Sequence, residues 1–178
     1  MTFPGSEIEI NLTRREVFSP RPHQQEAISK AIAGFETHDR GKLIMACGTG
    51  KTFTALRLAE QYAENNGGRA RILFLVPSIS LLSQTLKEWT AQNQEHLPLK
   101  SYAVCSDTKV SKKAEDIASY DLEVPVSTNG KDIAERTAQG KRRAGINVIF
   151  STYQSIEAIH EAQAEYGICL LYTSPSPR

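Results

Sequence analysis

The sequence predicts an α/β fold in which a parallel sheet carries helices on both of its faces. Continuous apolar runs such as 71–76 and 145–152, typical of strands buried on both faces of a parallel sheet, alternate with segments of helical periodicity. A glycine-rich loop, residues 48–52, lies directly between an apolar run and a helix-like segment. The 178 residues, 40% of them hydrophobic and 23% charged, are enough for one full core, so a single α/β domain is expected.

The expected elements follow from the positions of apolar residues, prolines and glycines. Pro22 suits the first turn of a helix that runs to about Gly34. Ser127 or Thr128 is expected to cap a helix that begins near Lys131. The other expected elements are helices over 51–65, 80–92 and 154–164, a helical hint at 112–119 within the irregular stretch 106–131, and strands over 42–46, 71–76, 99–105 and 145–152.

The glycine-rich loop has the order of parts that a phosphate-binding loop requires. A strand at 42–46 would deliver the loop, its glycines would let backbone N–H groups converge on phosphate oxygens, and the helix after it would point its positive end at the anion. Lys51 would reach the β- and γ-phosphates, and the hydroxyl of Thr52 would bind Mg²⁺. Met45 stands where the strict pattern has glycine, which leaves an ordinary strand–turn–helix as the alternative.

Beyond the loop itself, residues 18–168 resemble the first RecA-like domain of a superfamily 2 helicase or translocase. The stretch 21–25 resembles the adenine-reading Q motif, with Gln24 in the base-contacting position, and 45–52 matches motif I, where this superfamily commonly lacks the first glycine. The resemblance implies a RecA-like P-loop NTPase sheet, ATP and Mg²⁺ as cofactors, and catalytic roles for Lys51 and Thr52, with Thr52 as the Mg²⁺ ligand. The nucleotide-binding residues that it implies are Gln24, Cys47, Gly48, Thr49, Gly50, Lys51, Thr52 and Phe53.

Two further segments resemble the motifs that touch the nucleic-acid backbone in this superfamily. Residues 75–84 resemble motif Ia and residues 148–155 resemble the motif Ib region. The contacts implied are Pro77, Ser78, Gln84, Thr152, Tyr153 and Gln154. The residues of these motifs are most similar to those of the DEAD/DEAH-type helicases of restriction systems, of type ISP and of types I and III. DNA, in duplex form, is therefore the implied partner of the parent enzyme.

Plainer interpretations stay open at these positions. Ser78 would also serve as a helix cap, Gln84 as an exposed polar residue, and Thr152 as a strand-end hydroxyl. A net charge of +1 gives no whole-chain attraction to nucleic acid, so that partner depends on local residues. An ATP-binding switch module without a nucleic-acid role is the alternative function.

Cysteine usage and hydropathy suggest a location. Cys47, Cys105 and Cys169 are an odd number at unrelated spacings, which argues against a disulfide framework or a zinc site and fits the cytoplasm. No signal peptide or membrane-spanning apolar run is expected, and no membrane partner.

The C-terminal stretch has an unusual composition. Residues 169–178 continue no periodic pattern and resemble translated sequencing adapter, so they are expected to project from the core. The expected division is a lead-in over 1–17, a partial first RecA-like domain over 18–168, and an artefactual tail over 169–178. Motif II (Asp-Glu-x-His) occurs nowhere, and a second RecA-like domain with its arginine finger is missing. The chain is therefore expected to be a fragment that binds ATP but hydrolyses it near background, whereas its parent is a DNA-stimulated ATPase.

Overall fold

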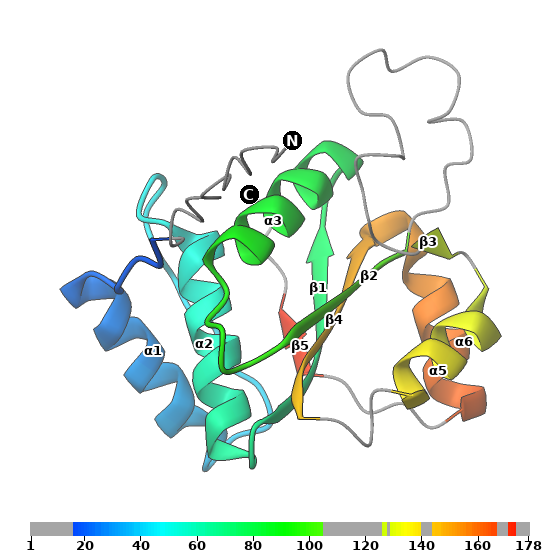
Figure 1. The fold of residues 1–178 in the computed structure, drawn as a ribbon, viewed down its shortest axis with the longest axis horizontal. Coiled ribbons are helices and arrows are strands. Elements are labelled where there is room, and N and C mark those ends of the chain that lie inside the picture. The colour runs from blue at the N-terminus through cyan, green and yellow to red at the C-terminus, as the bar shows by residue number, and fades with distance from the viewer. Residues whose placement is uncertain (1–15, 105–125, 128, 140–143, 167–170, 174–178) are drawn as a thin grey trace, which may run out of the picture.

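A computed structural model describes residues 16–104, 126–127, 129–139, 144–166 and 171–173 of the chain. These residues form one five-stranded parallel sheet of order β3-β2-β4-β1-β5, flanked by helices (Figure 1). The helices are α1 (Pro22–Phe35), α2 (Lys51–Asn65), α3 (Ile79–Gln92), α5 (Gly130–Gln139) and α6 (Ile156–Tyr166), with a 3-10 turn at Tyr153–Ser155. The strands are β1 (Arg69–Val76), β2 (Leu99–Val104), β3 (Val126–Ser127), β4 (Gly145–Thr152) and β5 (Leu171–Thr173).

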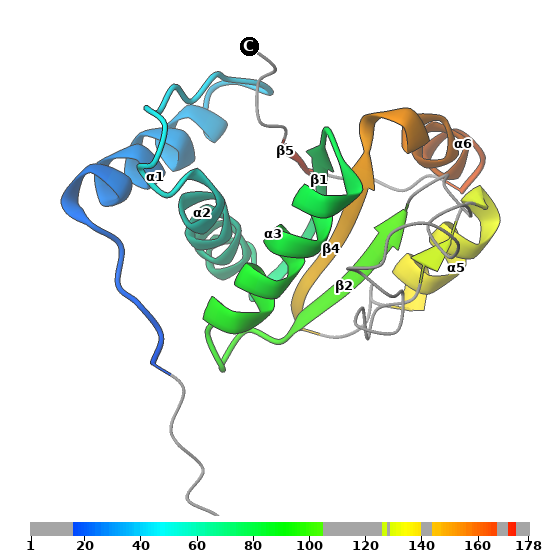
Figure 2. The same cartoon turned by 90° about the horizontal axis from the view of Figure 1, so that it is seen from above.

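The sheet separates two layers of helices, as the alternation of elements predicts (Figure 2). Side chains of β1 alternate between the two faces: Phe74 packs into one core with α2 and α3, and Leu73 packs into a second core with α5 and α6. Helix α1 lies outside this sandwich and packs on α2, where Phe35 meets Tyr62 edge to face with 6.0 Å between ring centroids.

Strands β1 and β4 form the centre of the sheet and bring their carboxyl ends together. They pair in parallel along their whole length, from Arg69 opposite Gly145 to Val76 opposite Thr152. Gly145 begins β4 with φ +124, and a Cβ there would lie 2.4 Å from the carbonyl oxygen of Pro98, so only glycine fits. The segments that follow Val76 and Thr152 therefore leave the sheet at the same edge.

Most of the expected elements are confirmed, and two details are wrong. Helix α2 has the predicted bounds, but residues 42–46 form no strand, and Ile44 is 84% exposed. A strand needs a neighbour for its backbone hydrogen bonds, and no described strand pairs with this segment. The cap of α5 is Asn129, whose Oδ1 accepts from the backbone N–H of Lys131 at 2.8 Å; Ser127 lies in β3, and Thr128 and the hint at 112–119 fall outside the described residues.

The C-terminal stretch also differs from its expectation. Of residues 169–178 the structure describes only Leu171–Thr173, and these form β5 at the edge of the sheet. Their backbone pairs in parallel with Ile72–Phe74 of β1 rather than projecting from the core. Within the described residues, no helix combines the length and the apolar character needed to cross a membrane.

Candidate functional site

The glycine-rich loop ends at the start of α2 and presents backbone N–H groups there. Gly48 and Gly50 adopt left-handed conformations with φ of 74° and 78°, which side chains rarely tolerate. Gly50 is the N-cap of α2, and the first intrahelical bond runs from the N–H of Thr54 to the carbonyl of Gly50 at 2.9 Å. The N–H groups of the preceding three residues have no partner within the helix, and the helix dipole adds positive charge to them. This is the geometry that binds phosphate.

Lys51 lies across this loop. Its ammonium donates to the carbonyl oxygen of Ala46 at 2.8 Å, and the hydroxyl of Thr49 donates to the same oxygen at 2.7 Å. Lys51, Cys47 and Gly48 are all exposed, whereas Thr52 is half-buried. Because an ammonium binds a phosphate oxygen more strongly than a neutral carbonyl, an incoming phosphate would take Lys51 from Ala46. The residues present thus fit the polyphosphate of a nucleotide, with Thr52 one position further along the helix.

Gln24 connects α1 to the loop. Its side-chain oxygen accepts from the backbone N–H of Arg21 at 2.8 Å, and its amide nitrogen donates to the carbonyl of Thr49 at 2.9 Å. The imidazole of His23 also approaches that carbonyl, at 3.3 Å. Gln24 is 5% exposed. The structure brings Gln24 to the loop, where its side chain supports Thr49; its contact with adenine stays a prediction.

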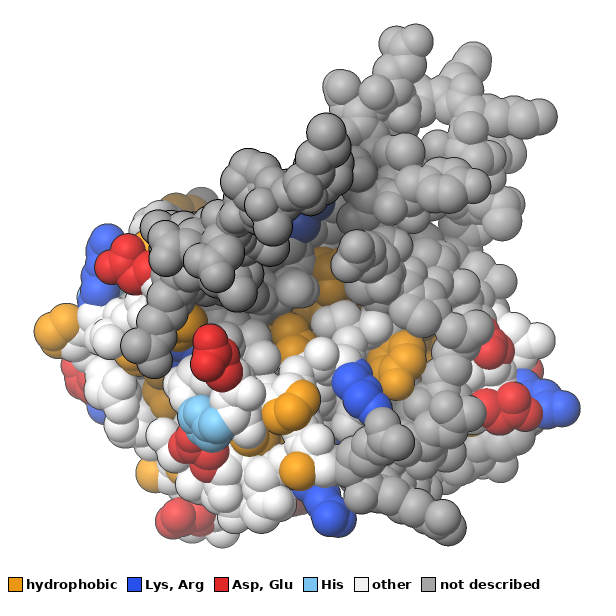
Figure 3. Space-filling view, in the orientation of Figure 1, with side chains coloured by type: hydrophobic (Ala, Val, Ile, Leu, Met, Phe, Trp, Pro, Cys, Tyr) orange, Lys and Arg blue, Asp and Glu red, His pale blue; other side chains and the backbone are white. Residues whose placement is uncertain are grey.

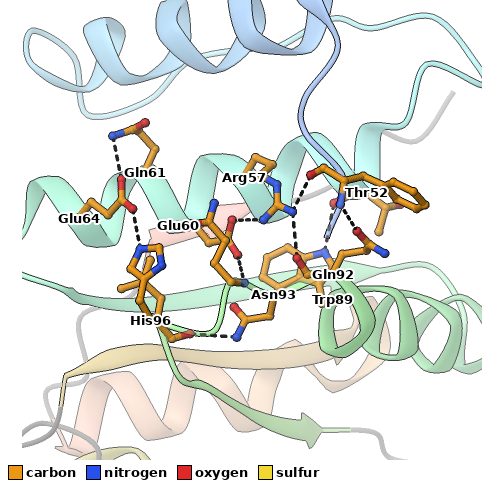
Figure 4. A network of polar contacts seen from close by, with 12 residues as sticks. Thr52, Arg57, Glu60, Gln61, Glu64, Trp89, Gln92, Asn93 and His96 are labelled. Carbon is orange, nitrogen blue, oxygen red and sulfur yellow. Dashed lines mark hydrogen bonds and ion pairs between the residues drawn. The ribbon is translucent and has the colours of Figure 1, made fainter. Parts of the chain in front are cut away.

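A buried polar network that sequence reasoning missed lies between α2 and α3 (Figure 4). Arg57 and Glu60 form an ion pair whose side chains are 4% and 1% exposed. Arg57 also donates to the carbonyl oxygens of Phe18 and Gln92, each at 3.0 Å, and its guanidinium stacks over the ring of Phe53 at 4.7 Å from the centroid. Phe53, expected to bind nucleotide, is therefore half-buried against Arg57. The signal available in the sequence was an Arg and a Glu three positions apart between the apolar residues of α2.

Trp89 belongs to the same network. Its indole N–H donates to the backbone carbonyl of Thr52 at 3.1 Å, so α3 is bonded directly to the first turn of α2. Glu60 extends the network in the other direction by accepting from the backbone N–H of Gln94 at 2.9 Å.

The residues expected to contact nucleic acid divide into two groups. Pro77, Ser78, Gln84 and Gln154 are exposed, and Tyr153 is half-buried. Thr152 is 3% exposed, and its hydroxyl lies 3.2 Å from the hydroxyl of Ser155. This agrees with the plainer interpretation of Thr152 as a strand-end hydroxyl with a local partner. Ser78 caps α3 by accepting from the N–H of Leu81 at 3.3 Å while remaining exposed.

The pairing of β1 with β4 brings Pro77, Ser78, Tyr153 and Gln154, which follow these strands, to one edge of the sheet. Gln84 lies further along the chain, on α3. The carboxyl ends of these two strands are neighbours, and open α/β sheets bind their ligands at that edge. The described residues on the face drawn in Figure 3 mix acidic, basic and apolar side chains. Among the parts of the chain that are described, no group of three or more His, Cys, Asp or Glu side chains could hold a metal ion.

A known protein family covers most of the chain. The family model of the type III restriction enzyme, res subunit, matches residues 17–168. The chain belongs to this family. The loop at the start of α2 and the α/β sheet behind it agree with this family. Together they form the RecA-like helicase fold.

Solved structures and curated relatives agree with that family. A nuclease-deletion mutant of the type ISP restriction-modification enzyme LlaGI, in complex with a DNA substrate mimic, is 41% identical with a TM-score of 0.72 over 88% of this chain and 15% of its own. The ATP-dependent type ISP enzyme LlaBIII, bound to DNA, is 40% identical with a TM-score of 0.70 over 84% of this chain and 10% of its own. A probable helicase of African swine fever virus is 29% identical over 79% of this chain and 14% of its own. This res-family chain thus spans about a seventh or less of the length of these proteins.

Proposed function

We propose that the chain is the ATP-binding part of a DNA-dependent ATPase of a restriction-modification system. The observation that carries the proposal is the loop 48–52, which combines two left-handed glycines, a helix start without a side-chain cap, and the Lys51 ammonium bonded to the carbonyl of Ala46. In this proposal Lys51 binds the β- and γ-phosphates, the N–H groups at the start of α2 hold the polyphosphate, and Thr52 binds Mg²⁺. The Mg²⁺ would supply charge neutralisation at the phosphates.

The remaining predicted residues complete the nucleotide site. Cys47, Gly48 and Thr49 would line the phosphates, Phe53 would support the loop through Arg57, and Gln24 would read adenine from its position beside Thr49. Because the side-chain oxygen of Gln24 accepts from Arg21, base reading would require that bond to be exchanged.

DNA is the proposed partner, in duplex form and in a larger parent enzyme. The titles of the two type ISP structures support DNA for those proteins. In this chain the proposed contacts are Pro77, Ser78, Tyr153 and Gln154, which follow the ends of β1 and β4, and Gln84, which is exposed on α3. The buried Thr152 would support them through its hydroxyl contact with Ser155. In the same proposal, the parent enzyme has a second RecA-like domain and is located in the cytoplasm.

The chain by itself should bind nucleotide without turning it over. Hydrolysis needs a carboxylate that orients water, and an arginine finger alone is worth about 10³–10⁵ in rate. Glu157 and Glu161 are exposed on α6, on the opposite side of the sheet from α2. Asp107, Asp116 and Glu123 belong to no motif that would supply a catalytic carboxylate, and they fall outside the described residues. Turnover that DNA stimulates in these 178 residues, and that Lys51→Ala abolishes, would contradict this part of the proposal.

The test of nucleotide binding is calorimetry with Mg-ADP and Mg-ATP. Lys51→Ala should weaken binding about ten- to hundredfold, because hydrogen bonds to charged groups contribute about 1.5–3 kcal/mol. Lys42→Ala, which removes an exposed lysine at the far end of the same segment, is the matched control and should leave affinity unchanged. Equal affinities for wild type and Lys51→Ala would refute the site.

The contact of Gln24 with adenine is tested separately, by the ratio of the affinities for ADP and for GDP. Gln24→Ala removes a bond to the loop, so affinity for ADP and for GDP should both fall. If Gln24 reads the base, the preference for ADP over GDP should also shrink. An unchanged preference would restrict Gln24 to loop support.

A further inference from the structure

We propose that Trp89 is a positioning residue for the magnesium side of the nucleotide site; this rests on the proposed function. Its indole N–H is bonded to the carbonyl of Thr52, the residue whose hydroxyl would bind Mg²⁺ (Figure 4). Neither the sequence motifs nor the family match assigns Trp89 a role. The proposal is that this bond holds the first turn of α2 where the hydroxyl of Thr52 meets the metal.

The donor is held in place by its surroundings. Trp89 is completely buried, and its ring meets Phe74 and Phe150 edge to face, with centroids 5.3 and 5.4 Å away. Phe74 and Phe150 are themselves paired across β1 and β4, 5.8 Å apart. An indole packed this way cannot turn without displacing the sheet, so its N–H has a fixed position relative to β1 and β4.

The acceptor stands in the first turn of α2. This turn follows the left-handed Gly50, has no side-chain cap, and its backbone N–H groups have no partner within the helix. A second bond from α2 to α3 supports the same arrangement: Arg57 donates to the carbonyl of Gln92, one turn beyond Trp89. The two bonds hold α2 against α3 at points five residues apart on α2 and three apart on α3.

The position of the cluster also connects the two proposed sites. Phe74 lies two residues before the end of β1, and Phe150 two residues before the end of β4, where the exposed residues proposed to contact DNA begin. Trp89 therefore contacts both Thr52 and the two aromatic residues near the ends of β1 and β4.

The alternative is that Trp89 is core packing whose N–H merely finds an acceptor, as buried tryptophans usually do. The two interpretations differ in what they predict for Mg²⁺. Lys51 and the loop N–H groups bind phosphate with or without metal, whereas the hydroxyl of Thr52 acts only through the metal. Loss of positioning should therefore reduce the gain in affinity that Mg²⁺ gives, and loss of packing should not.

The experiment measures ADP affinity by calorimetry with and without Mg²⁺ in three proteins: wild type, Trp89→Phe and Phe150→Leu. Trp89→Phe keeps an aromatic ring and removes the donor. Phe150→Leu is the matched control, since it reduces the same buried cluster and leaves the bond to Thr52 in place. Trp89→Phe should lower affinity for Mg-ADP by about two- to tenfold, the range for one hydrogen bond, and leave Mg-free affinity unchanged. Phe150→Leu should keep the full Mg²⁺ gain and lower only thermal stability.

The outcomes separate the two proposals. Wild type that binds no ADP at all would refute the proposed nucleotide site. Wild type that binds with a Mg²⁺ gain, together with Trp89→Phe that keeps that gain, would overturn the role of Trp89. Loss of the gain in both variants would also overturn it, because packing rather than the N–H would then be responsible.

A measurement on wild type alone guards against a variant that fails to fold. Trp89 is the sole tryptophan of the chain, so intrinsic tryptophan fluorescence reports on this one ring. Adding Mg²⁺ to the ADP complex should change its emission. An emission spectrum that Mg²⁺ leaves unchanged, while calorimetry shows that Mg²⁺ tightens binding, would contradict the proposal.

Discussion

The segment 46–52, which contains the glycine-rich loop, and the interior between α2 and α3 meet along α2, but they are held in different ways. The loop is largely exposed, and its contacts are single hydrogen bonds from side chains to carbonyls, such as Lys51 to Ala46 and Gln24 to Thr49. The interior is buried, and its central contact is the ion pair of Arg57 with Glu60, whose side chains are 4% and 1% exposed. Bonds of the first kind can be exchanged for bonds to a ligand at little cost, and those of the second cannot.

This difference suggests a division of labour along α2. The first turn of the helix belongs to the loop and is available to a phosphate, while the next two turns fix the helix on α3 and on the segment before α1. Substitutions in the loop should therefore change ligand affinity and leave stability nearly constant. Substitutions in the interior should lower stability and leave ligand affinity nearly constant, with the exception of Trp89, whose bond reaches Thr52 in the first turn of α2.

The largest expected effect comes from breaking the buried ion pair. Glu60→Gln keeps the shape and an acceptor for the N–H of Gln94 but leaves the charge of Arg57 without a counter-charge. Removing one partner of a buried pair costs about 3–5 kcal/mol, so the free energy of unfolding should fall by that amount in a denaturant titration.

The control for this prediction is an exposed ion pair of the same charge type. Glu26 pairs with Lys30 on the surface of α1, where the two side chains are 66% and 75% exposed. Glu26→Gln should leave the denaturation midpoint unchanged. Equal losses in Glu60→Gln and Glu26→Gln would break the contrast between interior and surface on which the comparison depends.

In the loop, a substitution is expected to reduce nucleotide affinity more than stability, and the effect is smaller than that of breaking the ion pair. Gly50→Ala puts a side chain at φ +78, and its Cβ would lie 2.6 Å from the amide nitrogen of Gln24. The left-handed conformation costs about 1–2 kcal/mol, and Gln24 would have to leave Thr49. Affinity for Mg-ADP in calorimetry should fall about tenfold or more, with a loss of stability no larger than the strain.

Gly34 provides the matched glycine. It lies inside α1 without a positive φ, and a Cβ there would meet nothing within 4 Å. Gly34→Ala should leave nucleotide affinity unchanged and raise stability by about 0.5–1 kcal/mol, because alanine is the better helix former. A Gly50→Ala variant that binds as tightly as Gly34→Ala would remove the loop conformation from the site.

The same contrast explains which features the sequence could predict. The bounds of α2 and β4 follow from periodicity, flanking glycines and a continuous apolar run, because those patterns act locally. The strand predicted at 42–46 rests on a short apolar run and on the order of parts in a phosphate-binding loop, and it is wrong because a strand also needs a partner elsewhere in the chain. The loop residues were recognisable because phosphate binding requires glycine and lysine at fixed spacing.

The interior could not be predicted in the same way. Arg57, Glu60 and Trp89 are spread over two helices, and their contacts depend on how α2 and α3 pack against β1 and β4. No spacing in the sequence distinguishes a buried arginine from one on an exposed helix face. The Asn129 cap was missed for a related reason: Ser, Thr and Asn are all good caps, and the choice among neighbours depends on where β3 ends.

The smallest prediction concerns Glu88, which lies on α3 between the buried face and the exposed one and so tests where the interior ends. Partial burial raises the pKa of the Glu88 carboxyl above its ordinary value of 4.5. The folded chain then holds this proton more tightly than the unfolded chain does, so the free energy of unfolding falls as the pH rises from the ordinary value through the raised one. At neutral pH the charge is mildly destabilising, and Glu88→Gln should raise the free energy of unfolding by less than about 0.5 kcal/mol, a small effect because the site is partly screened by water.

The stability gained in Glu88→Gln should shrink toward acid pH, where the wild-type carboxyl is protonated in both the folded and the unfolded state. Glu95→Gln, at an exposed position just beyond α3, controls for the loss of a negative charge in general. Denaturant titrations of both variants at neutral and acid pH measure the difference, and a gain at Glu88 that is the same at both pH values would show that Glu88 belongs to the surface rather than to the interior.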